Sequence, residues 1–449
     1  MTTHVAASPR IDQTSFCARY QHNRQRSRTL FDVLADDAYY SQPIALRHPI
    51  VFYDGHLPAF SFNTLVKRAL GRPSIDERLE RLFARGIDPA DTAPESKRHP
   101  RDEWPSRTDV QAFADEADRQ VLAALADEDL DRPGHPLLDR AEAVFTILEH
   151  EAMHQETLLY MWHRLPFEQK RRPVGYVPRV DGRVPGREWT DVPDGRVTLG
   201  VDRGSIPFGW DNEFPAHDVE IGAFSIERHD VTNAAFLEFV TAGGYNDQQW
   251  WRPGDWAWIQ DQRIAHPSFW ERRDDQWYWR GMFESVPLPL SWPVYVSFAE
   301  AAAYARWRGA RLPTEAEFNR SAYGTPDGSP RLHPWGDLKP APPHGVFDFA
   351  SWDPHPAGSH PAGRSAWGID DLVGNGWEWT GTPFAPFPGF QPMASYPEYS
   401  ADFFDGDHLV IKGASPATAR ELMRPTFRNW FRPRYPYVYA AFRLAKDRA

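Results

Sequence analysis

The sequence predicts an α plus α+β protein, with a helical bundle followed by a domain that is rich in irregular structure. Three observations support this. Up to about residue 165 the apolar residues recur with helical spacing. From Phe167 to Asp194, Lys, Arg, Pro and Gly replace that pattern, and beyond it short β-like runs alternate with loops rich in Gly, Pro and Trp. We therefore expect a bundle over residues 1–175, a linker over 176–193 and a second domain over 194–449.

The first domain is predicted to consist of amphipathic helices joined by moderate connections. Helical spacing of apolar residues places them at 15–35, 49–71, 75–85, 109–125 and 137–165, the third being short and charged. Pro58 is expected near the start of the second helix or at a kink close to His56. Residues 88–106 are polar and predict a surface loop. Four long amphipathic helices indicate a bundle, whose interior can hold a metal on inward-facing side chains.

The second domain is predicted to be α+β. Short β-like runs occur at 197–199, 219–221, 224–226, 294–296 and 409–411, and helices are expected at 233–241 and 298–308. The 19 Trp and 42 Pro of the chain indicate loops held by aromatic packing.

Composition excludes several classes of function. The net charge of −12 argues against nucleic acid or an anionic membrane as a partner. Cys17 is the only cysteine, so an intrachain disulfide and a cysteine zinc cluster are excluded, which suits a cytoplasmic location. The first residues lack an apolar export signal, and no run of 18 apolar residues occurs.

The segment Leu148-Glu149-His150-Glu151-Ala152-Met153-His154-Gln155-Glu156 carries the strongest chemical signal. His150 and His154 lie one turn apart on a predicted helix, so both imidazoles can bind one metal ion. Such a pair also arises by chance on a solvated helix face. Other features of the sequence are needed to distinguish a metal-binding pair from two solvated histidines.

Ordered motifs in the second half resemble those of the formylglycine-generating-enzyme (sulfatase-modifying factor) fold, a C-type-lectin-like scaffold. They are Asp211-Asn212-Glu213-Phe214-Pro215, Asp230-Val231-Thr232-Asn233, Gly309-Ala310-Arg311-Leu312-Pro313-Thr314-Glu315, His333-Pro334-Trp335-Gly336 and Asp371-Leu372-Val373-Gly374-Asn375-Gly376-Trp377-Glu378-Trp379. For most of these residues a structural role is expected, with Arg311 and Glu315 as internal ion-pair partners. The oxidases of this fold use cysteines that this domain lacks, so their activity is set aside.

The first half resembles a DinB-type bundle, and the pair of domains is similar to the ergothioneine and ovothiol sulfoxide synthases and to the related selenoneine synthases. This resemblance implies an Fe(2+)- and dioxygen-dependent enzyme that joins a chalcogen to a histidine-derived imidazole. The family's three metal ligands correspond to His56, His150 and His154. Glu156 is expected to orient a ligand imidazole or to be a surface carboxylate. Ligand chemistry alone also allows zinc.

The resemblance implies further site residues in the second domain, which is expected to cover the metal. Tyr396 and Tyr399 match the family's Tyr-x-x-Tyr, in which one phenol donates a proton or an electron and the other helps to hold the imidazole. Asn429 and Trp430 match the residues that receive hercynine, the betaine of histidine, and an aromatic face suits its trimethylammonium group. Aromatic packing in a Trp-rich core is the alternative for these residues.

Two departures from the family pattern concern the chalcogen donor. Phe431 stands where some ergothioneine enzymes have an Asp that contacts γ-glutamylcysteine, and Met153 replaces a polar residue before the second motif histidine. Both favour a selenosugar donor over a thiol donor. Arg98 and Arg101 are candidates for binding anionic groups of the donor, or are simply exposed charges.

The sequence therefore favours a non-haem iron oxygenase that acts on hercynine, with selenoneine synthesis ahead of ergothioneine sulfoxide synthesis from γ-glutamylcysteine or cysteine. A small-molecule or carbohydrate-binding protein with a structural metal is a non-enzymatic alternative. A zinc-dependent transferase or hydrolase related to DinB is a third.

Overall fold

The computed structural model describes residues 13–85 and 104–448. It divides into two compact units. Unit 1 comprises Met1–Tyr176 with two short segments from later in the chain, Gly204–Phe208 and Met393–Pro397. Unit 2 comprises Val177–Arg203, Gly209–Pro392 and Glu398–Ala449. Arg98 and Arg101 lie outside the described residues.

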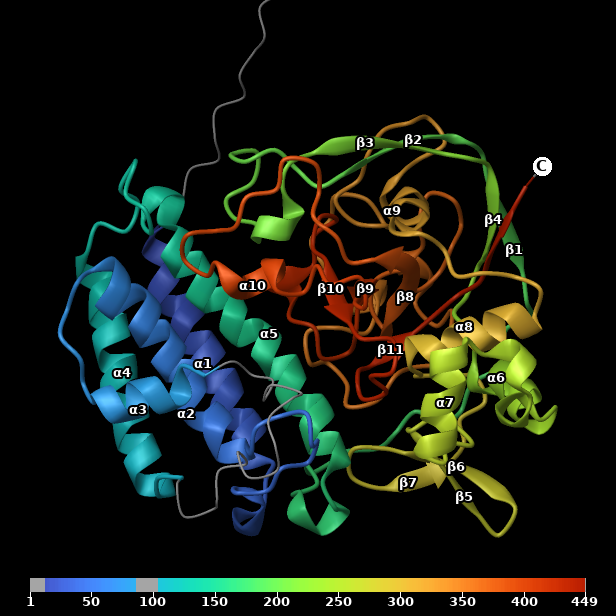
Figure 1. The fold of residues 1–449 in the computed structure, drawn as a ribbon, viewed down its shortest axis with the longest axis horizontal. Helices are drawn as coiled ribbons and strands as arrows, with labels where there is room; N and C mark the ends of the chain where they lie inside the picture. The colour runs from blue at the N-terminus through green and yellow to red at the C-terminus, as the bar shows by residue number, and fades with distance from the viewer. Residues whose placement is uncertain (1–12, 86–103, 449) are drawn as a thin grey trace, which may run out of the picture. The chain divides into compact units, whose positions relative to one another are not determined.

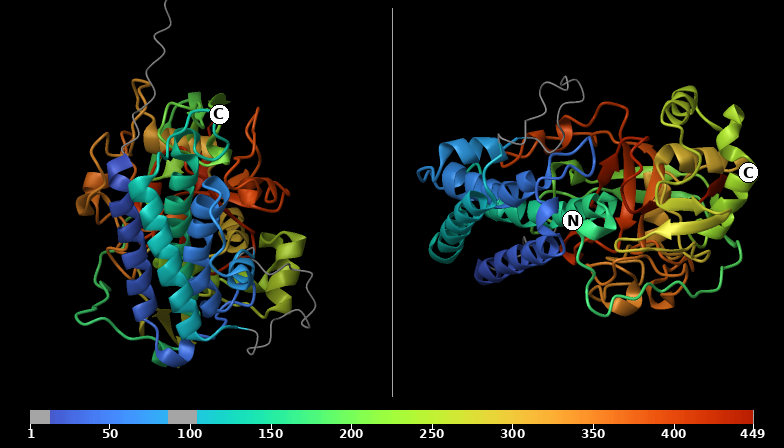
Figure 2. Two further views of the ribbon diagram at one scale, coloured as in Figure 1. Left: turned by 90° about the vertical axis from the view of Figure 1, so that its left-hand side faces the viewer. Right: turned by 90° about the horizontal axis from the view of Figure 1, so that it is seen from below.

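Unit 1 is a helical bundle in which the long helices lie side by side (Figures 1 and 2). Its main elements are α1(Phe16–Asp32), α2(Ile50–Ser61), the π-helix η3(Phe62–Ala69), α3(Glu77–Phe83), α4(Arg107–Asp127) and α5(Glu142–Arg164). The five predicted helical segments are therefore confirmed. Pro58 lies inside α2 and η3 continues it, so Pro58 neither begins nor ends the helix.

The predicted start of α5 at Leu137 is wrong. The helix begins at Glu142, because Arg140 and Ala141 adopt left-handed backbone angles, with φ of 55° and 56°. These angles break the i→i−4 hydrogen-bond ladder, and the preceding turn is a short 3-10 helix, η6(Asp139–Ala141).

Helix α5 is buried on nearly all sides, so its polar residues need internal partners. Arg24 of α1 donates to the Glu151 carboxylate at 2.9 Å and to Asp118 of α4 at 3.0 Å. The hydroxyl of Ser27 donates to Glu151 at 2.6 Å, and that of Tyr20 to Asp118 at 2.7 Å. These bonds tie α1, α4 and α5 together inside the bundle.

Unit 2 consists of small sheets and short helices joined by long loops. One sheet has the order β1(Trp189–Val192), β4(Phe224–Glu227), β12(Ala445–Asp447), and a second has β10(Asn429–Phe431), β9(Leu409–Ala414), β8(Gly376–Pro383), β11(Ala440–Ala441). A two-stranded sheet pairs β2(Gly195–Leu199) with β3(His217–Ile221), and a three-stranded sheet has the order β5(Trp270–Arg273), β6(Gln276–Arg280), β7(Ser285–Pro287). The helices are α6(Asn233–Thr241), α7(Pro253–Asp261), α8(Phe298–Trp307), α9(Glu315–Tyr323) and α10(Glu398–Ala401).

Most predicted elements of unit 2 are confirmed, but the strand expected at 294–296 is wrong. That segment is extended without belonging to a sheet, because its amides bond to separate parts of the chain: Val294 to the Val231 carbonyl and Val296 to the Ala440 carbonyl. Helices α7, α9 and α10 were not anticipated. Thr314 and Glu317 form a reciprocal capping box that starts α9.

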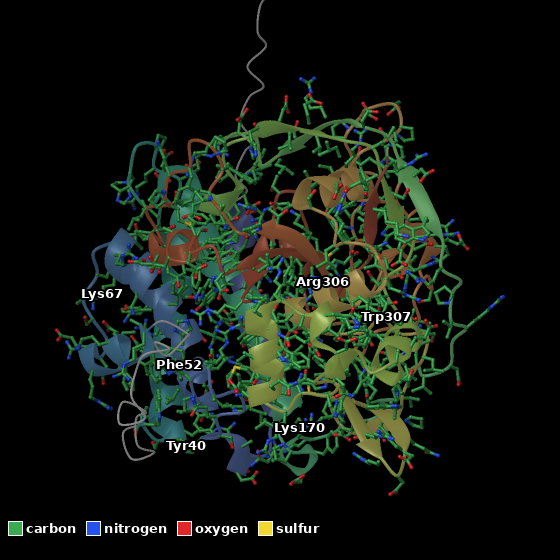
Figure 3. All side chains as sticks on the ribbon, turned by 45° about the vertical axis from the view of Figure 1, so that its right-hand side comes forward. Tyr40, Phe52, Lys67, Lys170, Arg306 and Trp307 are labelled. Carbon is green, nitrogen blue, oxygen red and sulfur yellow. The ribbon has the colours of Figure 1, made fainter. Side chains whose placement is uncertain are left out.

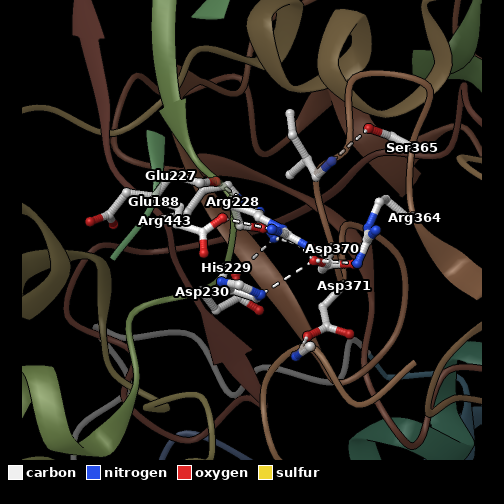
Figure 4. Close-up of polar contacts among 12 residues, drawn as sticks. Glu188, Glu227, Arg228, His229, Asp230, Arg364, Ser365, Asp370, Asp371 and Arg443 are labelled. Carbon is white, nitrogen blue, oxygen red and sulfur yellow. Dashed lines mark hydrogen bonds and ion pairs between the residues drawn. The ribbon is translucent and has the colours of Figure 1, made fainter. Parts of the chain in front are cut away.

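Ion pairs hold the loops of unit 2, and Figure 4 shows the polar contacts around Arg443 and Asp370. The fully buried Arg443 donates to the Glu378 carboxylate at 2.6 and 2.7 Å and to Asp230 at 3.2 Å. Arg311 and Glu315 are each ion-paired, as expected, but not with each other. Arg311 binds Glu317 at 2.7 Å, whereas Glu315 binds Arg428 at 2.9 Å.

Within the described ranges, no helix combines the length and apolar character needed to cross a membrane.

Arg24→Met should destabilise the bundle by about 3–5 kcal/mol, because it leaves the fully buried Glu151 carboxylate without its counter-charge. Urea unfolding followed by far-ultraviolet circular dichroism measures the change. Arg119→Met is the matched control on α4, since Arg119 forms a solvent-exposed pair with Glu116 and should leave stability close to wild type. Equal unfolding midpoints for the two variants would contradict the assigned role of Arg24.

Candidate metal centre

Three histidines converge inside unit 1. His56 comes from α2, while His150 and His154 lie one turn apart on α5. The Nε2 atom of His154 is 3.3 Å from that of His56 and 3.1 Å from that of His150. Among the described residues, these three form the one group of His, Cys, Asp and Glu side chains arranged to hold a metal ion.

All three imidazoles are held neutral by burial. Removal from water lowers the pKa of His56 to about 4. It also lowers the pKa of His150 and His154 well below the usual value, and the neighbouring histidines lower them further. A neutral imidazole offers a lone pair, which is the form that binds a metal.

A metal ion fits this donor set better than hydrogen bonds do. The Nδ1–H of His56 donates to the Phe83 carbonyl at 2.7 Å, which leaves its Nε2 as a bare acceptor. One proton can then satisfy only one of the two Nε2–Nε2 contacts of His154, whereas a cation satisfies all three nitrogens. Two imidazole nitrogens about 2.1 Å from one ion are about 3.0 Å apart at a right angle and about 3.4 Å apart at the tetrahedral angle, which brackets the two distances above.

Aromatic rings pack against the histidine cluster. Phe60 stacks on His150, with ring centroids 3.5 Å apart and planes 9° from parallel. Phe52, which is labelled in Figure 3, stacks on His56 at 4.9 Å. The ring of Tyr396 lies 6.1 Å from His150 and 5.3 Å from Phe60. The structure thus places one of the two predicted tyrosines beside the histidines, within the same unit.

The other residues expected to bind substrate lie in unit 2. Trp430 stacks on Phe384, with centroids 4.1 Å apart, and Tyr399 meets Trp430 edge-on at 5.3 Å. Asn429 accepts the backbone N–H of Trp430 at 2.9 Å. Phe431 stacks on Tyr435 at 5.4 Å instead of offering a polar group. Tyr399 and Asn429 therefore adjoin Trp430, whereas Phe431 packs separately on Tyr435, because successive side chains of β10 point to opposite faces.

The two further candidates on α5 differ in exposure. Glu156 is buried, so the alternative that it is a bare surface carboxylate is wrong. Met153 is half-buried. The roles proposed for both in binding or in orienting a ligand stay predictions.

Sequence reasoning missed several residues that shape the centre. Phe52 and Phe60 stack on the ligands, the Phe83 carbonyl orients His56, and Thr146 and Ser395 bond beside Tyr396. A signal was present for Thr146, which precedes His150 by four residues and so shares its face of α5. The same spacing was present for Phe52 and Phe60, which lie four residues before and after His56. None pointed to the Phe83 carbonyl or to Ser395, because these approach from distant parts of the chain.

Comparison with known proteins gives family matches to both parts of the chain. Residues 178–448 match the sulfatase-modifying factor enzyme 1-like domain, and residues 19–158 match the DinB superfamily. The predicted fold class, a DinB-type helical domain followed by a C-type-lectin-like domain, is confirmed.

Three relatives illustrate the similarity. The chain is 39% identical over 310 residues to the hercynine oxygenase of Mycolicibacterium smegmatis, covering 67% of this chain and 71% of that protein. It is 37% identical over 303 residues to the hercynine oxygenase of Mycobacterium tuberculosis, covering 67% and 70%. It is 28% identical over 506 residues to the ergothioneine biosynthesis protein 1 of Neurospora crassa, covering 92% of this chain but only 56% of that protein.

The histidine cluster should bind one divalent transition-metal ion per chain. In metal-stripped protein, Fe(II) or Zn(II) at 100 times its Kd should add about 2.7 kcal/mol of stability, seen as a rise in Tm. His154→Ala should lose both the bound ion and the rise in Tm, as measured by elemental analysis and thermal unfolding. His22→Ala, an exposed histidine on α1, is the control. Undiminished metal content in His154→Ala would place the ion elsewhere.

Proposed function

The chain belongs to the hercynine oxygenase family, and we propose that it uses Fe(II) and dioxygen to join a chalcogen atom to C2 of the hercynine imidazole. The observation that carries this proposal is the cluster of three buried, neutral imidazoles with Nε2 atoms 3.1 and 3.3 Å apart. The names of the relatives supply the substrate, hercynine.

His56, His150 and His154 would hold the metal. Three imidazoles on one face of Fe(II) leave positions for dioxygen and substrates, and the ion supplies the activation of dioxygen. The same ligands also bind zinc, so iron is part of the proposal and is tested with it.

The overall reaction balances without a further reductant. The C2–H bond of hercynine and the S–H or Se–H bond of the donor break. A carbon–chalcogen bond and a chalcogen–oxygen bond form. The four electrons that reduce dioxygen come from these two substrates, and the second oxygen atom leaves as water with the two released protons.

The chain's own residues would bind substrate and manage protons. Tyr396, whose ring is 6.1 Å from that of His150, holds a phenolic proton next to the centre. Trp430 would receive the trimethylammonium cation on its ring. Phe384 stacks on that ring, and Tyr399 and Phe403 lie against it, so the cation would be held among aromatic rings. Asn429 and Tyr399 adjoin Trp430 and would contact the rest of the hercynine molecule.

A selenosugar is the donor we favour, with selenoneine as the corresponding product class. Phe431 packs on Tyr435 and presents no carboxylate to the amine of a γ-glutamylcysteine donor, and Met153 is likewise apolar. A thiol donor is the second candidate, and the name ergothioneine biosynthesis protein 1 of one relative favours it. The two donors give different products, because one places selenium and the other places sulfur on the hercynine imidazole.

Protein loaded anaerobically with Fe(II) should consume dioxygen only when hercynine and a donor are both present. Selenosugar, γ-glutamylcysteine and cysteine are compared, with products identified by mass. His150→Ala should abolish dioxygen uptake and product, whereas His22→Ala should retain both. Full turnover in His150→Ala would refute the iron site, and activity with zinc but not iron would instead select the hydrolase or transferase alternative.

Trp430→Ala should weaken hercynine binding by about 5- to 30-fold, which corresponds to about 1–2 kcal/mol for a cation on a desolvated ring. Trp430→Phe keeps an aromatic face and should lose less. Isothermal titration with hercynine measures both variants. Trp258→Ala, a half-buried tryptophan on α7, is the control and should bind hercynine like wild type. Equal affinity in Trp430→Ala and Trp258→Ala would remove Trp430 from the site.

A further inference from the structure

The segment Met393–Pro397 is far from the helices in sequence, yet it belongs to unit 1. It meets α5 along the row of side chains that carries two of the histidines. Glu142, Thr146, His150 and His154 are spaced by four residues, so they share one face of the helix. The segment contacts three of these four successive positions.

Two hydrogen bonds join this row to Ser395. The backbone N–H of Ser395 donates to the Glu142 carboxylate at 2.9 Å. The hydroxyls of Ser395 and Thr146 lie 2.8 Å apart, and both side chains are fully buried. One turn further along α5, the ring of His150 faces Tyr396, the next residue of the segment. Ser395 is therefore fixed at two points immediately before the tyrosine.

A third contact comes from the other ligand-bearing helix. Arg68 of η3 donates to the carbonyl of Ser395 at 3.1 Å and to that of Ala394 at 3.4 Å. Since η3 continues α2, which carries His56, the segment is bonded to both helices that supply the metal ligands. Phe60 of α2 completes the arrangement by contacting the rings of both His150 and Tyr396.

We propose that Thr146 and Ser395 are positioning residues, whose buried hydroxyl pair sets the place of the Tyr396 phenol relative to the three-histidine centre. Adjacent residues share a peptide plane, so a shift of Ser395 moves the Tyr396 backbone and its ring. The inference rests on the proposed function, because the position of the phenol matters to turnover only if its proton is used there. Proton transfer requires approach to about 2.6–3.2 Å, and a misplacement of about 1 Å costs about 100-fold in rate.

The hydroxyl pair has no replacement when one partner is removed. Both side chains are shielded from water, so deletion of one hydroxyl leaves the other buried without that hydrogen bond. The segment is then expected to shift or to sample several positions, although the histidines themselves are untouched. Metal binding should therefore survive a change that impairs turnover.

Thr146→Val and Ser395→Ala test the pair, each alone and combined. Both are expected to lower kcat about 10- to 100-fold with little change in the KM for hercynine and with wild-type metal content. The double variant should be no worse than the single variants, because both remove the same bond. Thr146→Ser keeps the hydroxyl and should therefore retain most of the wild-type rate. Thr157→Val is the control, since its hydroxyl donates to the Met153 carbonyl within α5.

A second readout does not depend on activity. Protein containing 3-fluorotyrosine, with the Tyr396 resonance assigned by Tyr396→Phe, reports the surroundings of this ring by fluorine NMR. We expect the Tyr396 signal to shift or broaden in Thr146→Val and Ser395→Ala, and to match wild type in Thr157→Val. Should Thr146→Val fail to fold, as judged by its Tm, Ser395→Ala carries the same test.

The possible failures are distinguishable. Absence of dioxygen uptake by the wild-type protein with hercynine and every donor overturns the proposed function, while the fluorine spectrum still tests the positioning. Wild-type kcat and an unchanged Tyr396 signal in Ser395→Ala overturn the positioning role alone. A loss of metal together with rate would also overturn it, because the pair would then support the ligands instead of the phenol.

Discussion

The structure depends on one constraint: three uncharged imidazoles meet in the interior of a helical bundle, with the Nε2 atom of His154 within hydrogen-bond distance of the other two. Burial removes the charge that would drive them apart, and the Phe83 carbonyl fixes which nitrogen of His56 faces inward. Because these nitrogens cannot all be satisfied by protons, the cluster is suited to hold a cation. Elsewhere in the bundle, the buried Arg24 is ion-paired with Glu151 and Asp118.

Two kinds of residue surround the three histidines: aromatic rings that pack on them, and a tyrosine from a late segment of the chain. Phe52 and Phe60 stack on the ligand rings, which shields the donor set from water. On the same face of α5, a short segment from late in the chain adds a phenol. The backbone of Ser395, next to this tyrosine, is hydrogen-bonded to Glu142 and Arg68, which makes it more rigid than a free loop tip. The late segment thus places a second tyrosine ring near the histidines, in addition to Tyr53 of α2, whose ring lies 6.0 Å from that of His154.

Unit 2 shows a different route to order. Its strands are short and its loops are long, so few of its residues belong to regular hydrogen-bond ladders. Buried ion pairs such as Arg443 with Glu378 join its loops and strands instead. This explains the particular errors of the sequence predictions there. The apolar run at 294–296 has the composition of a strand but finds its partners singly, and Arg311 is paired with Glu317 instead of Glu315. Local patterns do not specify which of several acidic residues will be nearest.

By itself, the sequence determined the order of the two domains, the helices of the bundle and the placement of His150 and His154 on one helix face, because these follow from short-range periodicity. Its motifs also indicated the family. Only the tertiary structure brought His56 to that face, paired Thr146 with Ser395 and placed Tyr396 beside His150. These contacts join residues about 100 to 250 positions apart, and their partners are chosen by packing and by the hydrogen bonds left unsatisfied in the interior, neither of which a local pattern encodes.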